Sequence, residues 1–114
     1  MSFAATVDQV RQRRKTVTRR MGWAILKPGD RLVAVERARG VRVGDRVELA
    51  TIEVVDVRRE RLDAITAEDC AAEGFPELTP ADFVQLFARL NGLKGEDVGA
   101  TFVTRIRFRY VGGA

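Results

Sequence analysis

The sequence predicts one small α+β domain, residues 1–114, built around a coiled, barrel-like sheet with about three short helices. Three observations predict this fold. The segment 101–111 alternates apolar residues with arginines, as a half-buried strand does. The apolar phase slips within 46–58, so we expect a bulged or coiled strand there. Segments 66–74 and 79–91 carry the start and stop signals of helices.

Local signals place the first elements in order. Thr6 and Gln9 have the spacing of a capping box, which predicts a short helix from Val7. The sequence KPGD at 27–30 predicts a turn, because proline fixes one backbone dihedral and glycine allows a positive one. A strand over 31–37 follows the turn. The glycines of the 39–45 loop then indicate that the strand over 46–58 returns antiparallel.

Two helices are predicted after the long strand. Thr66 caps the first, and Gly74 suits the left-handed residue that ends it. Thr79, followed by proline, begins the second. Its apolar residues recur at helical spacing and are expected to face the core: Phe83, Leu86, Phe87 and Leu90.

The last strand, 101–111, places Arg105, Arg107 and Arg109 on one face. We expect a solvated face, because charged side chains there discourage edge-to-edge pairing. The alternative is that the three arginines lie along a nucleic-acid backbone.

Charge is distributed unevenly along the chain, whose net charge is +4. Residues 1–20 hold six basic residues and one acid, whereas 60–100 hold nine acids and three basic residues. We therefore expect a positive end and a negative end, of which only the positive end attracts a polyanion.

Composition excludes several classes of site. Cys70 is the only cysteine, so no intrachain disulfide forms, as is typical of a reducing compartment. The absence of histidine removes imidazole metal sites and His-based triads, and we expect no metal or cofactor. No apolar run approaches membrane length, so we expect a cytoplasmic protein with no membrane partner.

The densest cluster of cations is RRKTVTRR at 13–20, which we call the basic motif. Val17 and its two neighbouring threonines favour an extended backbone here, and such a segment suits phosphate or a polar heterocycle. Strict alternation places Lys15 on the face opposite Thr18. A bend at 16–17 is needed to bring these two side chains together.

The basic motif also carries a resemblance to a known family. Lys15 and Arg20 reproduce the spacing of the GxKxxxxR signature of ASCH domains, which resemble PUA domains. The KPGD turn, the IEVV segment at 52–55 and the last strand are similar to that family too, so the resemblance spans nearly the whole chain. Arg13 stands where the signature has glycine. The resemblance implies a small β-barrel with helices and an association with RNA.

Within that family, the chain resembles the small bacterial amidohydrolases that remove the acyl group from acetylated cytidine. Their proposed catalytic set is a lysine, a threonine three residues later and a glutamate on a later helix. It corresponds to Lys15, Thr18 and Glu73 in this sequence. The resemblance implies that Thr18 attacks the acyl carbon, Lys15 takes the hydroxyl proton and Glu73 returns it to the leaving amine.

Two functions from different classes follow. One is a module that binds RNA or a modified nucleoside, with Arg14, Arg19 and Arg20 on phosphate or carbonyl oxygens and Trp23 stacked on a base. The other is a metal-independent amidohydrolase acting on an acylated pyrimidine nucleoside. A ribonuclease is a third alternative. The sequence predicts no oligomeric state.

Overall fold

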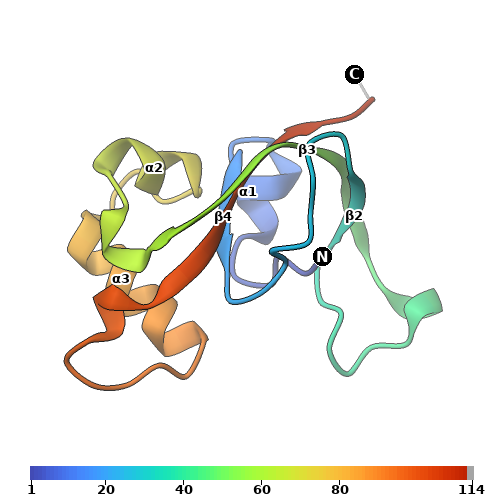
Figure 1. Cartoon of the computed structure of the whole chain (residues 1–114). Helices are drawn as coiled ribbons and strands as arrows, with labels where there is room; N and C mark the ends of the chain where they lie inside the picture. The colour runs from blue at the N-terminus through green and yellow to red at the C-terminus, as the bar shows by residue number, and fades with distance from the viewer. Residues whose placement is uncertain (113–114) are drawn as a thin grey trace.

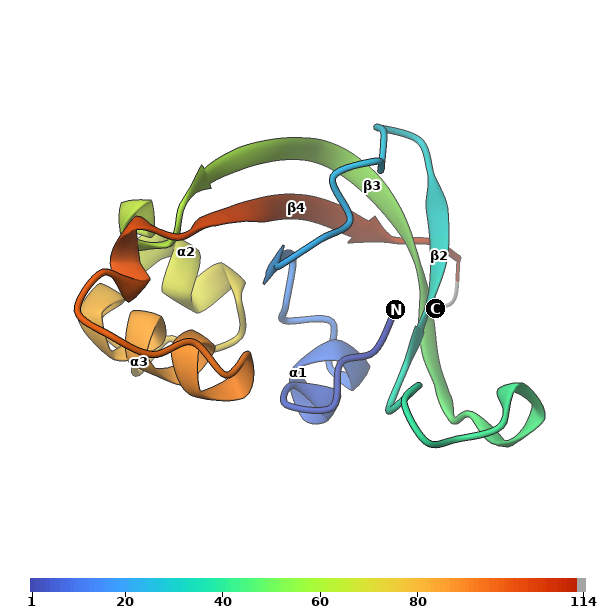
Figure 2. The same ribbon diagram turned by 60° about the horizontal axis from the view of Figure 1, so that its bottom comes forward.

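The computed structural model describes residues 1–112, and its centre is a curled antiparallel sheet of four strands (Figure 1). The sheet order is β1-β4-β3-β2, and each neighbouring pair is antiparallel. Figure 2 shows β3 and β4 arching over α1, with α2 and α3 packed at one end of the arch. The strands are β1 (Val17–Arg20), β2 (Arg31–Val35), β3 (Glu48–Arg61) and β4 (Phe102–Tyr110).

The long strand β3 contains a bulge, as the slip in its apolar phase predicted. Its pairing with β4 shifts register between Val54 and Asp56, so Val55 has no partner residue on β4. A bulge adds one residue to one strand, and the strand bends and twists there. The curled sheet and the α+β class are therefore confirmed.

The sheet is an open half-barrel because both of its outer edges have other partners. On the β2 edge, Phe3 donates a backbone hydrogen bond to Val35 and Val35 donates one to Met1, each 2.9 Å long. On the β1 side, Thr16, the residue before β1, donates to the carbonyl oxygen of Ala72 at 2.8 Å. In a closed barrel, β1 and β2 would pair with each other. Here residues 1–3 pair with β2 instead, and the end of α2 accepts a hydrogen bond from the residue before β1.

The three α-helices are α1 (Val7–Arg11), α2 (Ala67–Ala72) and α3 (Pro80–Leu90). Thr66 accepts a hydrogen bond from the Asp69 amide at the start of α2, and Thr79 forms a capping box with Asp82 at the start of α3. Both predicted caps are confirmed. The expected Thr6 capping box is wrong, since the Thr6 side chain makes no cap hydrogen bond and Gln9 donates to the Gly74 carbonyl.

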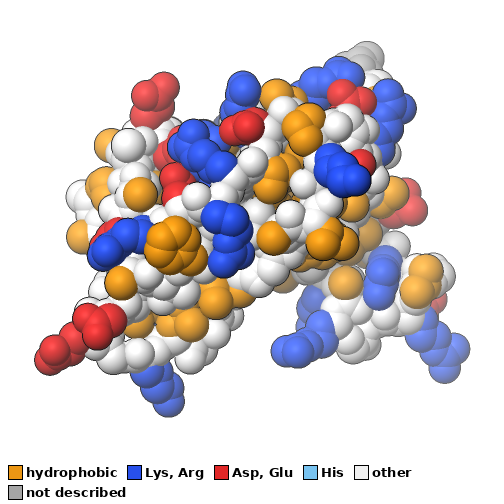
Figure 3. Space-filling model, in the orientation of Figure 1, with side chains coloured by type: hydrophobic (Ala, Val, Ile, Leu, Met, Phe, Trp, Pro, Cys, Tyr) orange, Lys and Arg blue, Asp and Glu red, His pale blue; other side chains and the backbone are white. Residues whose placement is uncertain are grey.

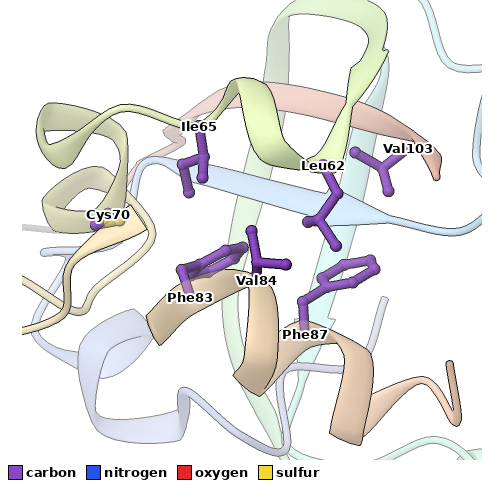
Figure 4. Packing of buried hydrophobic residues seen from close by; sticks show 7 residues of the cluster. All are labelled: Leu62, Ile65, Cys70, Phe83, Val84, Phe87 and Val103. Carbon is purple, nitrogen blue, oxygen red and sulfur yellow. The ribbon is translucent and has the colours of Figure 1, made fainter. Parts of the chain in front are cut away.

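Two apolar clusters form the core. One lies between α2, α3 and the adjacent ends of β3 and β4 (Figure 4), and it contains Leu62, Phe83, Phe87 and Val103. The other lies beneath the arch and contains Phe3, Val10, Ala34, Ile52 and Phe108. Phe3 of the second cluster and Phe83 and Phe87 of the first line one cavity together with residues of the basic motif.

The arginine face of β4 is solvated only in part. Arg107 and Arg109 are exposed, as expected, but Arg105 is buried and bonds Asp69 of α2. The expectation of a fully solvated face is therefore wrong at Arg105, because α2 covers that end of the strand. Within residues 1–112, no helix has the length and apolar character needed to cross a membrane.

Candidate functional site

A cavity of about 280 Å³ lies where the two apolar clusters meet. One wall is apolar and includes Phe75, Phe83 and Phe87 from the α2–α3 region. The other walls come from residues 2–6, the basic motif and the end of α2. The polar side chains of Lys15, Thr18, Arg19, Arg20 and Glu73 all line this cavity.

Lys15 and Glu73 form a buried ion pair in the cavity wall. The Lys15 Nζ lies 2.7 Å from Glu73 Oε1 and 2.8 Å from the Glu73 backbone oxygen, and both side chains are less than 5% exposed. Burial lowers the pKa of the Lys15 ammonium; the Glu73 carboxylate opposes this shift, and Arg20 and Arg19 add to it. Lys15 therefore gives up its proton more readily than a solvated lysine.

The backbone on both sides of Lys15 fixes its position. Arg13 has a positive φ of 57°, which turns the chain sharply after α1. The Tyr110 hydroxyl donates a hydrogen bond of 2.6 Å to the Lys15 carbonyl oxygen. These contacts tie Lys15 to the end of β4.

Glu73 is placed by the end of α2. It is the C-cap residue, and Gly74 follows it with a φ of 101°, the left-handed conformation that favours glycine. A Cβ on Gly74 would lie only 2.8 Å from Gln9 Cγ, so α1 packs closely against this turn. The turn directs the Glu73 side chain to the basic motif.

Arg19 lies at the centre of three carboxylates. Its Nη2 is 2.7 Å from Glu60 and 2.5 Å from Asp69, and its Nη1 is 3.3 Å from Glu73 Oε2. Arg105 binds Asp69 as well, and these two guanidinium groups lower the pKa of the Asp69 carboxyl to about 2.

The expected separation into a positive and a negative end is therefore wrong at the basic motif. The acids of α2 and β3 fold back onto its cations, as the Arg19 contacts with Glu60 and Asp69 show. On the face shown in Figure 3, basic and acidic side chains are interspersed with hydrophobic ones. The paired cations are neutralised within the fold and attract a polyanion less than free ones do.

Arg20 organises the other end of the motif. Its Nε donates to the Thr18 hydroxyl at 3.3 Å, and its Nη2 donates to the Ser2 carbonyl. Its guanidinium lies over the Phe3 ring, 4.8 Å from the ring centre. Arg20 thereby holds residues 2–3 against the buried hydroxyl of Thr18.

Strict alternation through the basic motif is wrong. The strand covers only Val17–Arg20, and Lys15 precedes it, so alternation does not relate Lys15 to Thr18. Glu73 lies beside this edge strand and is reached by both Lys15 and Arg19. The predicted catalytic residues Lys15, Thr18 and Glu73 are thus brought together in one cavity.

Two predicted binding residues do not line the cavity. Arg14 is exposed, and Trp23 is 40% exposed in the connection between β1 and β2. Trp23 also has a φ of 65°, an unusual conformation for a bulky residue. Ligand contacts by these two residues stay predictions and concern the surface outside the cavity.

Sequence reasoning did not find the partners of Arg19 and Arg105. Asp69 of α2 and Glu73, the C-cap residue of that helix, are four positions apart, which places their side chains on one face. That spacing is a usable signal for a shared cationic partner. Within residues 1–112, no group of three or more His, Cys, Asp or Glu residues is arranged to hold a metal ion.

A second hollow, of about 470 Å³, lies between α1 and the connection that joins β2 to β3. Its lining includes Val7, Arg37 and Val47, and none of its lining residues is buried. It offers no buried polar group to orient a ligand, so the first cavity is the better candidate site.

Two of the solved structures that match this chain cover nearly all of it. One is protein EF3133 from Enterococcus faecalis V583, described with the family model DUF984, at 18% identity and a TM-score of 0.64, covering 94% of this chain and 67% of that one. The other is an ASCH domain from Lactobacillus crispatus JV V101, at 13% identity and a TM-score of 0.63, covering 93% and 70%. The chain has the ASCH-domain fold.

The ASCH-like fold predicted from the basic motif is therefore confirmed. No family model and no curated protein matches the sequence. At these identities, the likeness shows the ASCH fold alone.

Proposed function

We propose that the cavity binds a modified nucleoside, free or as part of an RNA strand. The observation that carries this proposal is the convergence of Lys15, Thr18 and Glu73 opposite an apolar wall. A volume of about 280 Å³ is close to the lower end of the range for small-molecule sites. The aromatic rings suit a flat base, and the cations and the hydroxyl suit its polar edge.

The charge arrangement favours a nucleoside over a bare phosphate backbone. Lys15 and Arg19 are bonded to carboxylates inside the fold, so they have little net charge to offer a polyanion. Arg14 and Trp23 are exposed and are proposed to contact neighbouring nucleotides when the ligand is an RNA strand. A cytoplasmic location belongs to this proposal.

Calorimetric titration with cytidine, acetylcytidine and a short cytidine-containing RNA tests the binding proposal. Thr18→Val replaces the buried hydroxyl by a methyl group of similar size and is expected to weaken nucleoside binding about ten-fold. Thr16→Val, at an exposed threonine of the same motif, is the control and is expected to bind as the wild type does. Equal affinity of the two variants for the nucleosides would contradict the proposal.

A second candidate function is hydrolysis of the amide of an acylated cytidine, favoured by the buried Lys15–Glu73 pair. A lysine acts as a general base only when it is neutral, and burial lowers the pKa of Lys15 in that direction. Glu73 lies within hydrogen-bond reach of Lys15 Nζ, and Thr18 lines the same cavity. Lysine–hydroxyl pairs are known substitutes for Ser–His pairs in acyl transfer.

The reaction proceeds in two balanced steps. Thr18 Oγ1 forms a bond to the acyl carbon while its proton passes to Lys15, and the C–N bond breaks as a proton reaches the leaving amine through the Lys15–Glu73 pair. Water then adds to the threonyl ester, and the carboxylic acid leaves as Thr18 recovers its proton. Arg20, which bonds Thr18, is placed to stabilise the negative oxygen that develops on the acyl group.

Release of cytidine and acetate from acetylcytidine tests the second candidate. Lys15→Met is expected to abolish turnover, whereas Lys27→Met, at an exposed lysine, is the matched control and is expected to leave it unchanged. A quenched reaction should contain protein that is heavier by one acetyl group on Thr18. Turnover that persists in Lys15→Met rejects this mechanism without rejecting nucleoside binding.

A further inference from the structure

We propose that Arg19 is a positioning residue that holds Glu73 Oε2, so that Glu73 Oε1 remains on Lys15 Nζ. The sequence suggests a different role, in which Arg19 binds ligand directly with the other cations of the basic motif. The consequence for catalysis rests on the amidohydrolase candidate. The placement of Glu73 does not, and it is testable without a substrate.

The contacts of Arg19 leave it little capacity to bind a ligand. Its side chain is 1% exposed, and both donors of Nη2 are directed to carboxylates, one on Glu60 and one on Asp69. Nη1 donates to Glu73 Oε2 at 3.3 Å, and the buried Nε has no partner. The guanidinium is thus committed to the protein at both terminal nitrogens.

The two other carboxylates fix the guanidinium itself. Glu60 is on β3, and Asp69 is on α2. Asp69 is held in turn by Arg105 of β4, through contacts of 2.7 Å and 3.1 Å to its two oxygens. Because these anchors come from three different elements, Arg19 has a fixed position and presents Nη1 to Glu73 from a rigid frame.

Glu73 is therefore held from two sides. Arg19 donates a hydrogen bond to Oε2 and Lys15 donates one to Oε1. Together these two contacts fix the orientation of the carboxylate. Arg19 also lowers the proton affinity of Lys15, since it places a positive charge near the ammonium. Removing Arg19 should free the carboxylate, and Lys15, which then loses the larger effect of Glu73, should give up its proton at lower pH.

Titration of lysine side chains by NMR, with 13C at Cε, provides the first test. The chain has only three lysines, so Lys15 is assigned by comparing the wild type with Lys27→Arg and Lys94→Arg. In Arg19→Met, the midpoint for Lys15 is expected to move to lower pH, because the released Glu73 carboxylate no longer stabilises the ammonium. Arg107→Met removes an exposed cation of β4 and is expected to leave the Lys15 midpoint unchanged. An unchanged midpoint in Arg19→Met, or a midpoint at higher pH as the loss of a positive charge alone would give, overturns the proposal.

Arg19→Lys keeps the positive charge and provides the second test. This variant also serves if Arg19→Met does not fold. An ammonium group cannot bridge three carboxylates as the planar fork does, so Glu73 loses its hold while the charge balance persists. With acetylcytidine, kcat is expected to fall about ten- to a hundred-fold with KM nearly unchanged. A rise in KM at constant kcat identifies Arg19 as a ligand-binding residue and overturns the positioning role.

The two proposals fail in distinguishable ways. A wild-type protein without hydrolysis, in which Arg19→Met still moves the Lys15 midpoint to lower pH, rejects the amidohydrolase and supports the placement of Glu73. Hydrolysis by the wild type, combined with an unmoved or raised Lys15 midpoint in Arg19→Met, rejects the positioning role and leaves the amidohydrolase intact.

Discussion

The ammonium group of Lys15 contacts two oxygens of one residue, the Glu73 carboxylate at 2.7 Å and the Glu73 backbone carbonyl at 2.8 Å. These residues are 58 positions apart in the chain, and both side chains are almost fully buried. The backbone contact fixes the ammonium to the end of α2, and the carboxylate contact balances its charge. The pair thus joins the basic motif to α2 and supplies a proton-exchanging group to the cavity.

Glu73→Ala should destabilise the fold by about 3–5 kcal/mol, because it leaves a buried ammonium without its carboxylate. The double variant Lys15→Met, Glu73→Leu should recover most of this loss, since neither charge is then buried. Urea unfolding gives the free energies. Asp63→Ala breaks the exposed Arg61–Asp63 pair, which solvent screens, and should cost much less than Glu73→Ala. Similar costs for Glu73→Ala and Asp63→Ala would show that Lys15 and Glu73 are solvated.

The Asp69 carboxyl should make stability depend on acid pH. Its pKa is about 2 in the fold against 3.8 for the free side chain, so its contribution is present above 3.8 and is lost as pH falls through 2. Arg105→Gln removes the hydrogen bonds that lower the Asp69 pKa most, so the contribution should be smaller and its loss should end at higher pH. Urea unfolding from about pH 6 down to about pH 2 measures both curves. If the stability curves of the wild type and Arg105→Gln coincide, Arg105 does not lower the pKa of Asp69.

Gly74→Ala should be more destabilising than Gly92→Ala. Both glycines have a positive φ, 101° and 66°, so alanine adds a strain of about 1–2 kcal/mol at either position. Only at Gly74 does the new Cβ meet another side chain, with Gln9 Cγ 2.8 Å away, whereas Gly92 faces open space. The loss of unfolding free energy in Gly74→Ala should exceed that in Gly92→Ala, and the excess reports the contact with Gln9. Nucleoside binding should weaken only in Gly74→Ala, because Gly74 follows Glu73.

The phenol of Tyr110, the only tyrosine, should titrate far above its ordinary pH. Burial raises the pKa of Tyr110 to about 12 against 10.0 for the free side chain. Its ultraviolet absorbance should therefore change near pH 12 in the folded protein and near pH 10 in urea. Because the folded pKa is raised, the stability that Tyr110 contributes is complete below 10 and is lost as pH rises through 12.

The hydrogen bond from Tyr110 to the Lys15 carbonyl is tested by Tyr110→Phe. The variant should lose about 1 kcal/mol of stability, with no further loss between about pH 10 and about pH 12. An absorbance midpoint near 10 in the folded wild type would place the phenol in solvent.

Elements with local signals were predictable from the sequence. The α3 helix has its capping box, its proline and its apolar period within 79–91, and the bulge of β3 is visible as a slip in phase. Thr6 failed as a cap because the same local pattern is compatible with a threonine side chain that lines a cavity. Local patterns do not determine which side chain a tertiary contact recruits.

The candidate site was predictable mainly through family resemblance. Spacing alone does not bring Glu73 to Lys15, because the packing of α2 beside β1 determines that contact. The same packing decides that Arg19 and Arg105 contact Asp69 rather than ligand or water. Charge patterns in the sequence identified the cations, and only the tertiary structure identified their partners.

The strand order has a consequence for how the site assembles during synthesis. Every residue that lines the cavity lies within the first 91, yet among residues 1–112 the strand β1 pairs only with β4, which ends at Tyr110. A ribosome-bound chain that stops before β4 already contains all the side chains that line the cavity. It has no strand with which β1 can pair. Contacts this distant in sequence form slowly. Competence to bind should therefore arise late and in a single step, when the last strand inserts between β1 and β3.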